Sequence, residues 1–310
     1  MKQLHLLWIT LLFSCSASTQ PPQTAQTGWQ PDPKELEGSL YFLASPLLEG
    51  REAGSRGSLI AAEYIASVML QNGLLPAGDT LAGATEWFQD FELTRGEEKV
   101  IVRNVLGMIR GSDTTKYVVI GTHYDHLGMR GETIYPGAED NASGVSGLLA
   151  LSKHWNSRGK LPPCNLIFAA WTAEEKGQLG SKYFVSHFAP GAETLLLNIN
   201  LDMISRSDPQ DTACNILSVG ILKDDTRTRE IVNRNNTAPD INLALDIWET
   251  DGNGESDYVG FASRGIPVMT FYAGANSDYH TPQDTRDKID LTKMMKVLKL
   301  VNGCLEDFLE

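Results

Sequence analysis

The sequence predicts an α/β protein whose sheet is mainly parallel and is covered by helices on both faces. From residue 33 to residue 310, short apolar runs alternate with segments of helical periodicity, which is the pattern of βαβ units. The run NLIFAAW at 165–171 is apolar throughout, as expected for a strand that is buried on both faces. No internal repeat and no second linker interrupts this pattern, so residues 33–310 are expected to form a single domain.

The elements are predicted from their periodicity and their boundary residues. Ser58 is expected to cap a first helix that stops near Gly73. Asp290 is expected to cap a long terminal helix, because apolar residues recur at helical spacing after it. Between them we expect strands at 100–109, 117–121, 165–171, 195–201, 216–219 and 267–272, and helices at 141–155, 179–188 and 224–233.

The first 32 residues have the composition of a targeting segment and a linker. A short positive start is followed by an apolar run from Leu4 to Phe13, which is too short to span a bilayer stably. Residues 12–15 (LFSC) resemble a bacterial lipoprotein box, so residues 1–15 are expected to be a signal peptide with lipidation at Cys15. The alternative is an ordinary signal peptide cut near Ala17. Either way, we expect export to the cell envelope, as a lipoprotein of the periplasm or outer membrane, or secretion.

Residues 16–32 are small, polar and proline-rich, and they are expected to form a flexible tether. The formal net charge of −13 argues against a nucleic-acid-binding protein, which needs a basic surface. Beyond Cys15 the chain has only Cys164, Cys214 and Cys304, so no disulfide framework is expected, although a single disulfide stays open.

A histidine and carboxylates stand where one predicted strand ends and the next helix begins. His123 and Asp125 follow the strand at 117–121, and Asp140 comes directly before the helix at 141–155. In open α/β sheets, ligands bind at the carboxyl ends of the strands. This arrangement therefore indicates a metal site at that edge of the sheet.

Three further predicted strands end in residues of the same types. Glu174 and Glu175 follow NLIFAAW, Asp202 follows LLLNINL, and His280 follows the strand at 267–272. Any one of these residues alone is more often a helix cap or a solvated loop residue. Four strand ends that supply complementary ligand types make a metal centre the better interpretation.

These residues can form two metal sites if one carboxylate is shared. His123 with Glu175 is expected to hold one ion and Asp202 with His280 the other, and Asp140 bridges them. Imidazole and carboxylate ligands without thiolates suit Zn²⁺. Two such ions about 3.5–4 Å apart can activate a shared water for attack on a carbonyl group.

The neighbours of these ligands suggest further roles. Because Glu174 and Glu175 are adjacent, their side chains point in different directions, so Glu174 can stay free as the general base. Asp125 is placed to accept the His123 imidazole N–H and so fix its tautomer. His126 is expected to be structural. HExxH, GxSxG and P-loop motifs are absent.

The motif blocks resemble the co-catalytic dizinc aminopeptidase family of the secreted leucyl-aminopeptidase type. The blocks are THYDHLG at 122–128, GAEDNASGV at 137–145, TAEEKGQLGS at 172–181, NLDM at 200–203 and DYHTPQDT at 278–285. The resemblance implies a three-layer α/β/α sandwich around a mixed, mostly parallel sheet, the zinc exopeptidase fold. It also implies two Zn²⁺ ions, and it assigns the zinc ligands as His123, Asp140, Glu175, Asp202 and His280.

The same resemblance implies that Glu174 is the general base and that Asp125 supports His123. The substrates would be peptides with a free N-terminus and a neutral or apolar first residue. Trp248, Phe271, Tyr272 and Tyr279 are candidates for the wall of an apolar pocket.

The chain departs from the family pattern at two places. Tyr258 follows Ser256-Asp257 where relatives commonly have a histidine, so a substrate contact by that histidine is not expected here. Ser205 stands where a glycine often follows the Asp-Met block, which is expected to affect only a turn.

Three alternatives are weighed against the aminopeptidase. A glutaminyl cyclase shares the fold but uses a single zinc, and the complete ligand set argues against it. A carboxypeptidase of the same fold remains open, because the loops that recognise a peptide end cannot be placed from sequence. An inactive lipoprotein that only binds peptides would be expected to have lost ligands or the base, and all are present.

Overall fold

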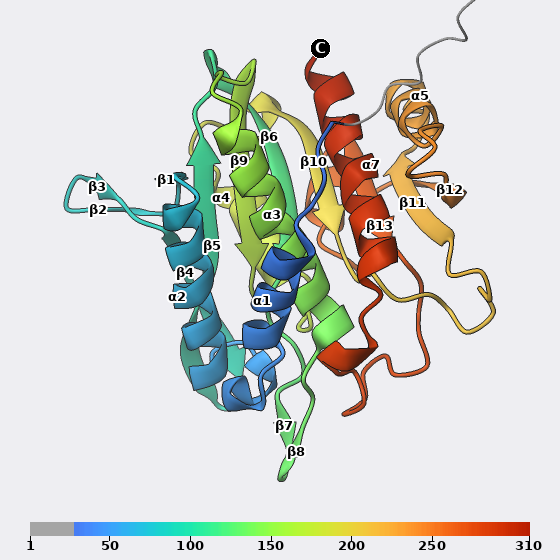
Figure 1. Ribbon diagram of the computed structural model, residues 1–310. Helices are drawn as coiled ribbons and strands as arrows, with labels where there is room; N and C mark the ends of the chain where they lie inside the picture. Colours follow the sequence, from blue (N-terminus) through green and yellow to red (C-terminus); the bar gives the residue numbers. More distant parts are fainter. Residues whose placement is uncertain (1–27) are drawn as a thin grey trace, which may run out of the picture.

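A computed structural model describes residues 28–310, and its main feature is one nine-stranded sheet (Figure 1). The strand order is β1-β5-β9-β6-β10-β13-β11-β12, and β4 pairs with β5 at the same end. The strands are β1 (Leu75–Pro76), β4 (Phe88–Arg95), β5 (Glu98–Ile109), β6 (Asp113–His123), β9 (Cys164–Trp171), β10 (Leu195–Leu201), β11 (Ile216–Leu222), β12 (Ala244–Thr250) and β13 (Val268–Tyr272). Two small hairpins stand apart, β2 (Thr80–Leu81) with β3 (Ala84–Thr85), and β7 (Met129–Arg130) with β8 (Thr133–Ile134).

The four central strands run parallel to one another. β9 and β10 both pair in parallel with β6, and β13 pairs in parallel with β10. Antiparallel partners flank this group, since β5 runs against β9 and β11 runs against β13. The carboxyl ends of the central strands therefore lie at one edge of a mixed, mostly parallel sheet, as predicted.

Helices cover both faces of this sheet (Figure 1). One face carries α1 (Pro33–Leu43), α2 (Arg56–Gln71), α3 (Gly144–Ser157) and α7 (Leu291–Leu309), with α5 (Thr226–Asn235) beside α7. The other face carries α4 (Leu179–His187) and α6 (Val259–Ala262), which bury Phe184 and Phe261 against Trp171 of β9. The predicted three-layer sandwich is confirmed. Short helical turns complete the chain: η1 (Pro46–Arg51), η2 (Ala138–Ser143), η3 (Ala192–Thr194) and η4 (Arg286–Lys288).

The two predicted helix caps had different outcomes. The Asp290 side chain accepts a hydrogen bond from the N–H of Lys293 (3.0 Å), so the predicted start of α7 is confirmed. The prediction for Ser58 was wrong, because α2 begins at Arg56 and its cap is Ser55, which accepts from the N–H of Ser58 (3.2 Å). Ser58 lies in the first helical turn, and its hydroxyl donates back to the Ser55 carbonyl (2.9 Å).

Three elements, α1, β4 and β12, were not predicted from the sequence. Asp32 caps α1 by accepting from the N–H of Lys34 (2.9 Å), and Pro33 opens the helix. β4 alternates buried and exposed residues, and β12 is only partly buried, so neither presents the continuous apolar run that identified the central strands.

Only the last five residues of the predicted N-terminal segment, 28–32, are described by the structure. The expected signal peptide, Cys15 and most of the expected tether lie outside the described residues. Residues 28–32, assigned to the tether, contact the domain: Trp29 stacks on His154 with 4.8 Å between ring centroids, and Gln30 Nε2 lies 3.5 Å from Asp240. Within residues 28–310, no helix has the length and apolar character needed to cross a membrane.

The described cysteines are all free. Cys164 and Cys304 are buried, and Cys214 is exposed. Burial raises the pKa of the Cys164 thiol to about 11, so it stays protonated and packs as a small apolar group. Residues 28–310 therefore contain no disulfide.

Candidate metal centre

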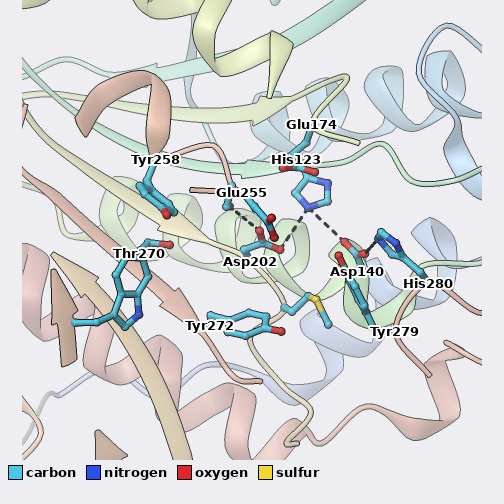
Figure 2. Close-up of a pocket in the computed structure, with 13 residues that line it drawn as sticks. His123, Asp140, Glu174, Asp202, Glu255, Tyr258, Thr270, Tyr272, Tyr279 and His280 are labelled. Carbon is cyan, nitrogen blue, oxygen red and sulfur yellow. Dashed lines mark hydrogen bonds and ion pairs between the residues drawn. The ribbon is translucent and has the colours of Figure 1, made fainter. Parts of the chain in front are cut away.

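Loops at the carboxyl edge of the sheet bring the predicted ligands together. His123 ends β6, Glu175 follows β9, Asp202 follows β10, and His280 lies in the loop after β13. Asp140 comes from η2, directly before α3. In Figure 2, His123, Asp140, Asp202 and His280 surround one cavity. The expectation that these side chains meet at one edge is confirmed.

The side chains form two groups of donor atoms that share Asp140. The first contains His123, Asp140 and Asp202, and the second contains His126, Asp140, Glu175 and His280. Within each group all ligand atoms lie within 4.8 Å of one another, close enough to surround one ion.

The two oxygens of Asp140 face different groups. Oδ1 lies 3.4 Å from His123 Nε2, and Oδ2 lies 3.1 Å from His280 Nε2. His123 Nε2 is also 3.4 Å from Asp202 Oδ1, and His280 Nε2 is 3.3 Å from Glu175 Oε2. Asp140 is therefore placed to bridge two ions.

The predicted pairing of the ligands was wrong. His123 lies with Asp202, whereas it was expected with Glu175, and His280 lies with Glu175, whereas it was expected with Asp202. The distance of each residue from its strand end explains the difference. His123 and Asp202 stand directly at the ends of the neighbouring strands β6 and β10, whereas β9, the other neighbour of β6, ends at Trp171, four residues before Glu175. Glu175 and His280 come from loops that follow the outer pair, β9 and β13, and meet each other beyond the strand ends.

His126 belongs to the second group, although the sequence predicted only a structural role. Its ring is fully buried, and Nδ1 lies 2.9 Å from Glu175 Oε1 and 3.5 Å from Asp140 Oδ2. An N–H at this nitrogen would orient the Glu175 carboxylate, and a lone pair there would supply a further donor. The signal that was available is its position three residues after His123, at the same strand end.

The residue after the shared aspartate fastens three elements together. The Asn141 side chain donates to Thr122 Oγ1 (2.9 Å) at the end of β6 and to the Leu201 carbonyl (3.0 Å) at the end of β10. Its Oδ1 accepts from the N–H groups of Gly144 (3.0 Å) and Met203 (3.1 Å). The buried amide is fully satisfied, so the backbone at the bridging position is held in one place.

A second set of buried groups holds the other side of that backbone. The Asp284 carboxylate accepts from the N–H groups of Glu139 (3.0 Å) and Asp140 (3.1 Å). Glu139 in turn accepts from the N–H groups of Ser205 (2.7 Å) and Arg206 (2.9 Å), and burial raises its pKa to about 7. The Ser205 N–H group therefore helps to support the site through its hydrogen bond to Glu139, in addition to the expected effect of Ser205 on a turn. Sequence reasoning missed this network, because side-chain-to-backbone bonds leave no periodic pattern.

Asp125 supports the site differently from the prediction. The His123 Nδ1–H group faces the main-chain carbonyl of Asp125 at 3.2 Å, while the carboxylate Oδ1 is 3.9 Å away, too far for a hydrogen bond. That Oδ1 instead accepts from the N–H of Glu174 (3.1 Å), and burial raises the pKa of Asp125 to about 7. Asp125 therefore fixes the tautomer of His123 through its backbone and the position of Glu174 through its side chain.

Asp202 is oriented by a hydroxyl group from a distant loop. Ser256 Oγ donates to Asp202 Oδ2 at 2.6 Å. Asn200 Nδ2 donates to Ser256 Oγ (2.9 Å) and to Thr270 Oγ1 (3.1 Å), so the hydroxyl is held as well. Such supporting bonds fix the direction in which a carboxylate presents its lone pairs.

The two adjacent glutamates have opposite electrostatic environments. Burial and the nearby carboxylates of Asp257 and Asp202 raise the pKa of Glu174 to about 9. Glu175 is also buried, but hydrogen bonds from His126 and His280 outweigh that effect and hold its pKa well below the usual range. Environments that separate the pKa values of neighbouring acids assign them different roles.

The histidines respond to the same carboxylates. Hydrogen bonds to Asp140 and Glu175 raise the pKa of His280 to about 10. Burial alone would lower the pKa of His123, but Asp202 and the nearby Glu174 raise it well above 6.5. Buried carboxylates at this density require positive charge, and a divalent cation supplies it in the most compact form.

A cavity of about 240 Å³ opens beside the donor groups. Its wall away from the ligands is formed by Met203, Trp248, Glu255, Ser256, Tyr258, Thr270, Tyr272 and Tyr279 (Figure 2). Trp248, Tyr272 and Tyr279 were predicted for this wall. Phe271, predicted with them, is wholly buried in the core and does not line the cavity. Successive residues of a strand point to opposite faces, so Phe271 and Tyr272 cannot both face the site.

The donor set fits zinc. Imidazole nitrogens and carboxylate oxygens converge without a thiolate. His123, His126 and Asp140 are almost completely buried, and Glu175 is partly buried. Hydrogen bonds position two of these donors, because the Asp140 N–H donates to the Asp284 carboxylate and the Ser256 hydroxyl donates to the Asp202 carboxylate.

Comparison with known proteins connects this site to one family. The sequence pattern of peptidase family M28 matches residues 104–304. Leupeptin-inactivating enzyme 1 of Streptomyces exfoliatus is 31% identical over 217 residues, covering 69% of this chain and 44% of that protein. The chain therefore spans less than half of the length of this relative.

Solved structures share the fold at lower sequence identity. BSAP, a zinc aminopeptidase from Bacillus subtilis, has a TM-score of 0.70 and 18% identity, covering 91% of this chain and 96% of its own. A glutaminyl cyclase of Porphyromonas gingivalis has a TM-score of 0.65 and 15% identity, covering 89% of this chain and 96% of its own. At these identities the likeness shows the zinc exopeptidase-like fold and does not choose between the two activities.

Proposed function

We propose that this chain, which belongs to peptidase family M28, is a dizinc aminopeptidase that removes the first residue from peptides. The observation that carries the proposal is the pair of donor groups that share Asp140 next to Glu174 on the wall of one cavity. His123, Asp140 and Asp202 would hold one zinc ion, and Asp140, Glu175 and His280 would hold the other. The name of the structural neighbour BSAP, a zinc aminopeptidase, supports the same activity.

Zinc ions bound here would supply an activated water nucleophile and a Lewis acid for the scissile carbonyl group. The chain's own residues then have separate tasks. Asp140, Asp202 and Glu175 would offset most of the charge of the ions. The Ser256 hydroxyl donates to the Asp202 carboxylate, and the Asp284 carboxylate holds the backbone of Asp140 by accepting from its N–H.

Glu174 is proposed as the general base. Its side chain lines the cavity, is 8% exposed, and is steadied by a hydrogen bond from Gln178 Nε2 to Oε1 (3.1 Å). A carboxylate at this position can take a proton from the attacking water and deliver it to the leaving amine. Burial raises its affinity for a proton, and zinc ions bound beside it would favour its charged form, so the group can accept a proton and release it again.

The first residue of the substrate is proposed to be neutral or apolar. Beyond the ligands, the cavity is walled mainly by Met203, Trp248, Tyr258 and Tyr272. The indole N–H of Trp248 is already bonded to Ser218 Oγ (2.8 Å), so the ring offers an apolar face. A cavity of about 240 Å³ accommodates one side chain.

Export is proposed from the sequence of residues 1–15, with Cys15 as the lipid attachment site. Radiolabelled palmitate incorporation into the wild-type chain, and its loss in Cys15→Ser, is the direct test. A chain that is cut near Ala17 and carries no label would show an ordinary signal peptide.

The activity is tested with purified protein that starts at Ser16. The substrates are short peptides in matched pairs with a free and an acetylated N-terminus, before and after chelation and zinc restoration. We expect release of the first residue only from the free peptides, lost on chelation and restored by zinc.

The alternatives give different products in this assay. Conversion of an N-terminal glutamine to pyroglutamate would identify a cyclase. Equal cleavage of the acetylated peptides from the C-terminal end would identify a carboxypeptidase. Peptide binding without turnover in the zinc-restored protein would leave only a binding role.

A further inference from the structure

One carboxylate in the cavity has no task in the proposed chemistry. Asp140 and Asp202 are assigned to the metal ions, and Glu174 to proton transfer. Glu255 also lines the cavity, and the lining residues include no lysine or arginine that could neutralise it. In Figure 2 its side chain reaches into the space between Tyr258 and Asp202.

The loop that carries Glu255 is fastened on its N-terminal side. The Asn253 carbonyl accepts from Thr250 Oγ1 (3.0 Å) and Tyr258 Oη (3.3 Å), and the Asn253 N–H donates to Asp251 Oδ1 (3.2 Å). Gly254 has φ 153°, and a Cβ there would lie 1.7 Å from Tyr258 Oη. Only glycine therefore lets the loop pack this tightly against the Tyr258 ring.

The loop is fastened on its C-terminal side by the site itself. Ser256, the next residue, donates its hydroxyl to Asp202 Oδ2 at 2.6 Å and accepts from Asn200 Nδ2 at 2.9 Å. The backbone at Glu255 is therefore held beside the first donor group, and its exposed side chain lines the cavity.

We propose that Glu255 binds the α-ammonium group of the substrate and so contributes to the selection of peptides with a free N-terminus. This assignment rests on the proposed aminopeptidase function. It makes Glu255 a specificity-determining residue, distinct from the metal ligands and from the proton acceptor.

The charges of the site favour this assignment. Two divalent ions carry four positive charges, and Asp140, Asp202 and Glu175 supply three negative charges, so the loaded centre is not attractive to a further cation. Glu174 changes its charge during each turnover. Glu255 takes no part in metal binding or proton transfer, so it can hold an ammonium group next to the metal centre during the whole reaction.

The position also separates the α-ammonium from the side chain of the first residue. Glu255 lies beside Asp202 and Ser256, whereas the wall formed by Trp248, Tyr272 and Thr270 has no acid. An apolar side chain can enter the aromatic part while the ammonium group stays at the acidic part.

The test compares zinc-restored wild type with Glu255→Gln, and uses Glu249→Gln as the matched control. Glu249 is an exposed acid on β12 that pairs with Arg229 (2.8 Å) and does not line the cavity. We expect Glu255→Gln to raise KM for a leucyl peptide roughly three- to tenfold, the range of a partly exposed charge pair, with kcat within about twofold. Zinc content should stay that of the wild type, and the Glu249 variant should match it throughout.

A binding measurement makes the test independent of turnover. Calorimetry with 3-methylbutylamine and with 3-methylbutan-1-ol compares an ammonium and a hydroxyl group on the same apolar skeleton. Wild type should prefer the amine, and Glu255→Gln should lose most of that preference. Equal weakening of both ligands would mean that Glu255 only shapes the loop.

Two further outcomes separate the two proposals. If Glu255→Gln impairs only peptides that begin with lysine or arginine, Glu255 reads the side chain and the α-ammonium assignment is wrong. If the wild type binds the amine through Glu255 but cleaves no peptide, the aminopeptidase proposal fails while the ammonium site stands.

Discussion

Replacing Glu174 with glutamine removes the proton-accepting carboxylate from the cavity and leaves the shape of the side chain nearly unchanged. The Glu174 side chain is almost fully buried, and one of its oxygens accepts a hydrogen bond from Gln178 Nε2 (3.1 Å). The glutamine oxygen can accept the same bond. The variant therefore tests the loss of the base with little change in packing.

The expected loss of turnover in Glu174→Gln follows from the role of Glu174 as general base. A positioned general base contributes about 10²–10⁴-fold to the rate, which corresponds to roughly 3–5 kcal/mol in the barrier. Glu174 is in neither donor group, so zinc content should not change. Because neighbouring carboxylates and burial disfavour its charged form, the folded protein should not lose stability either.

The assay measures kcat on a leucyl peptide together with zinc bound per chain. Glu175→Gln is the matched control, since it makes the same chemical change one residue later, in a side chain that belongs to a donor group. We expect Glu174→Gln to keep its zinc and lose turnover, and Glu175→Gln to lose zinc as well. A Glu174→Gln variant that retains its zinc and turns over within tenfold of wild type would refute the assignment of the base.

Three further changes test the supports of the site and the fold. Asp284→Asn should weaken zinc binding about 10–100-fold by loosening the backbone of Asp140, measured by competition with a chelator. Arg51→Met leaves buried carbonyls without the guanidinium that donates to them, and should cost about 3–5 kcal/mol in urea unfolding. Burial lowers the pKa of His154 to about 4, so between pH 6.5 and 4 this imidazole is protonated only in the unfolded chain. The free energy of unfolding should therefore fall as the pH is lowered through that window, by roughly 1 kcal/mol because His154 is partly exposed to solvent. His154→Phe, which keeps a ring for Trp29 to stack on, should flatten that slope.

The features that the sequence could predict are those that depend on local pattern. The central strands β6, β9, β10 and β13 were found because burial on both faces requires continuous apolar runs. The ligand types followed from the residues directly after those runs. Edge elements such as β12 were missed because their partial burial weakens the apolar signal.

The features that could not be predicted depend on which strands are neighbours. The sequence order of the central strands is β6, β9, β10 and β13, whereas their order in the sheet is β9, β6, β10 and β13. The consecutive strands β6 and β9 do lie side by side, with Trp171 opposite His123, but Glu175 comes four residues after the end of β9. The crossover that puts β6 between β9 and β10 brings Asp202 to His123 instead.

The set of candidate ligands is the same for either pairing, and the reason is chemical. Each half of the centre needs one imidazole and one unshared carboxylate to balance an ion that also shares Asp140. His123 and His280 can each be combined with either Glu175 or Asp202 and satisfy that rule, so composition cannot choose between the two arrangements. The arrangement is determined by the sheet, because β6 and β10 are adjacent and place Asp202 beside His123. The hydrogen bond from Ser256 also holds Asp202 on the side of the cavity where Glu255 lies.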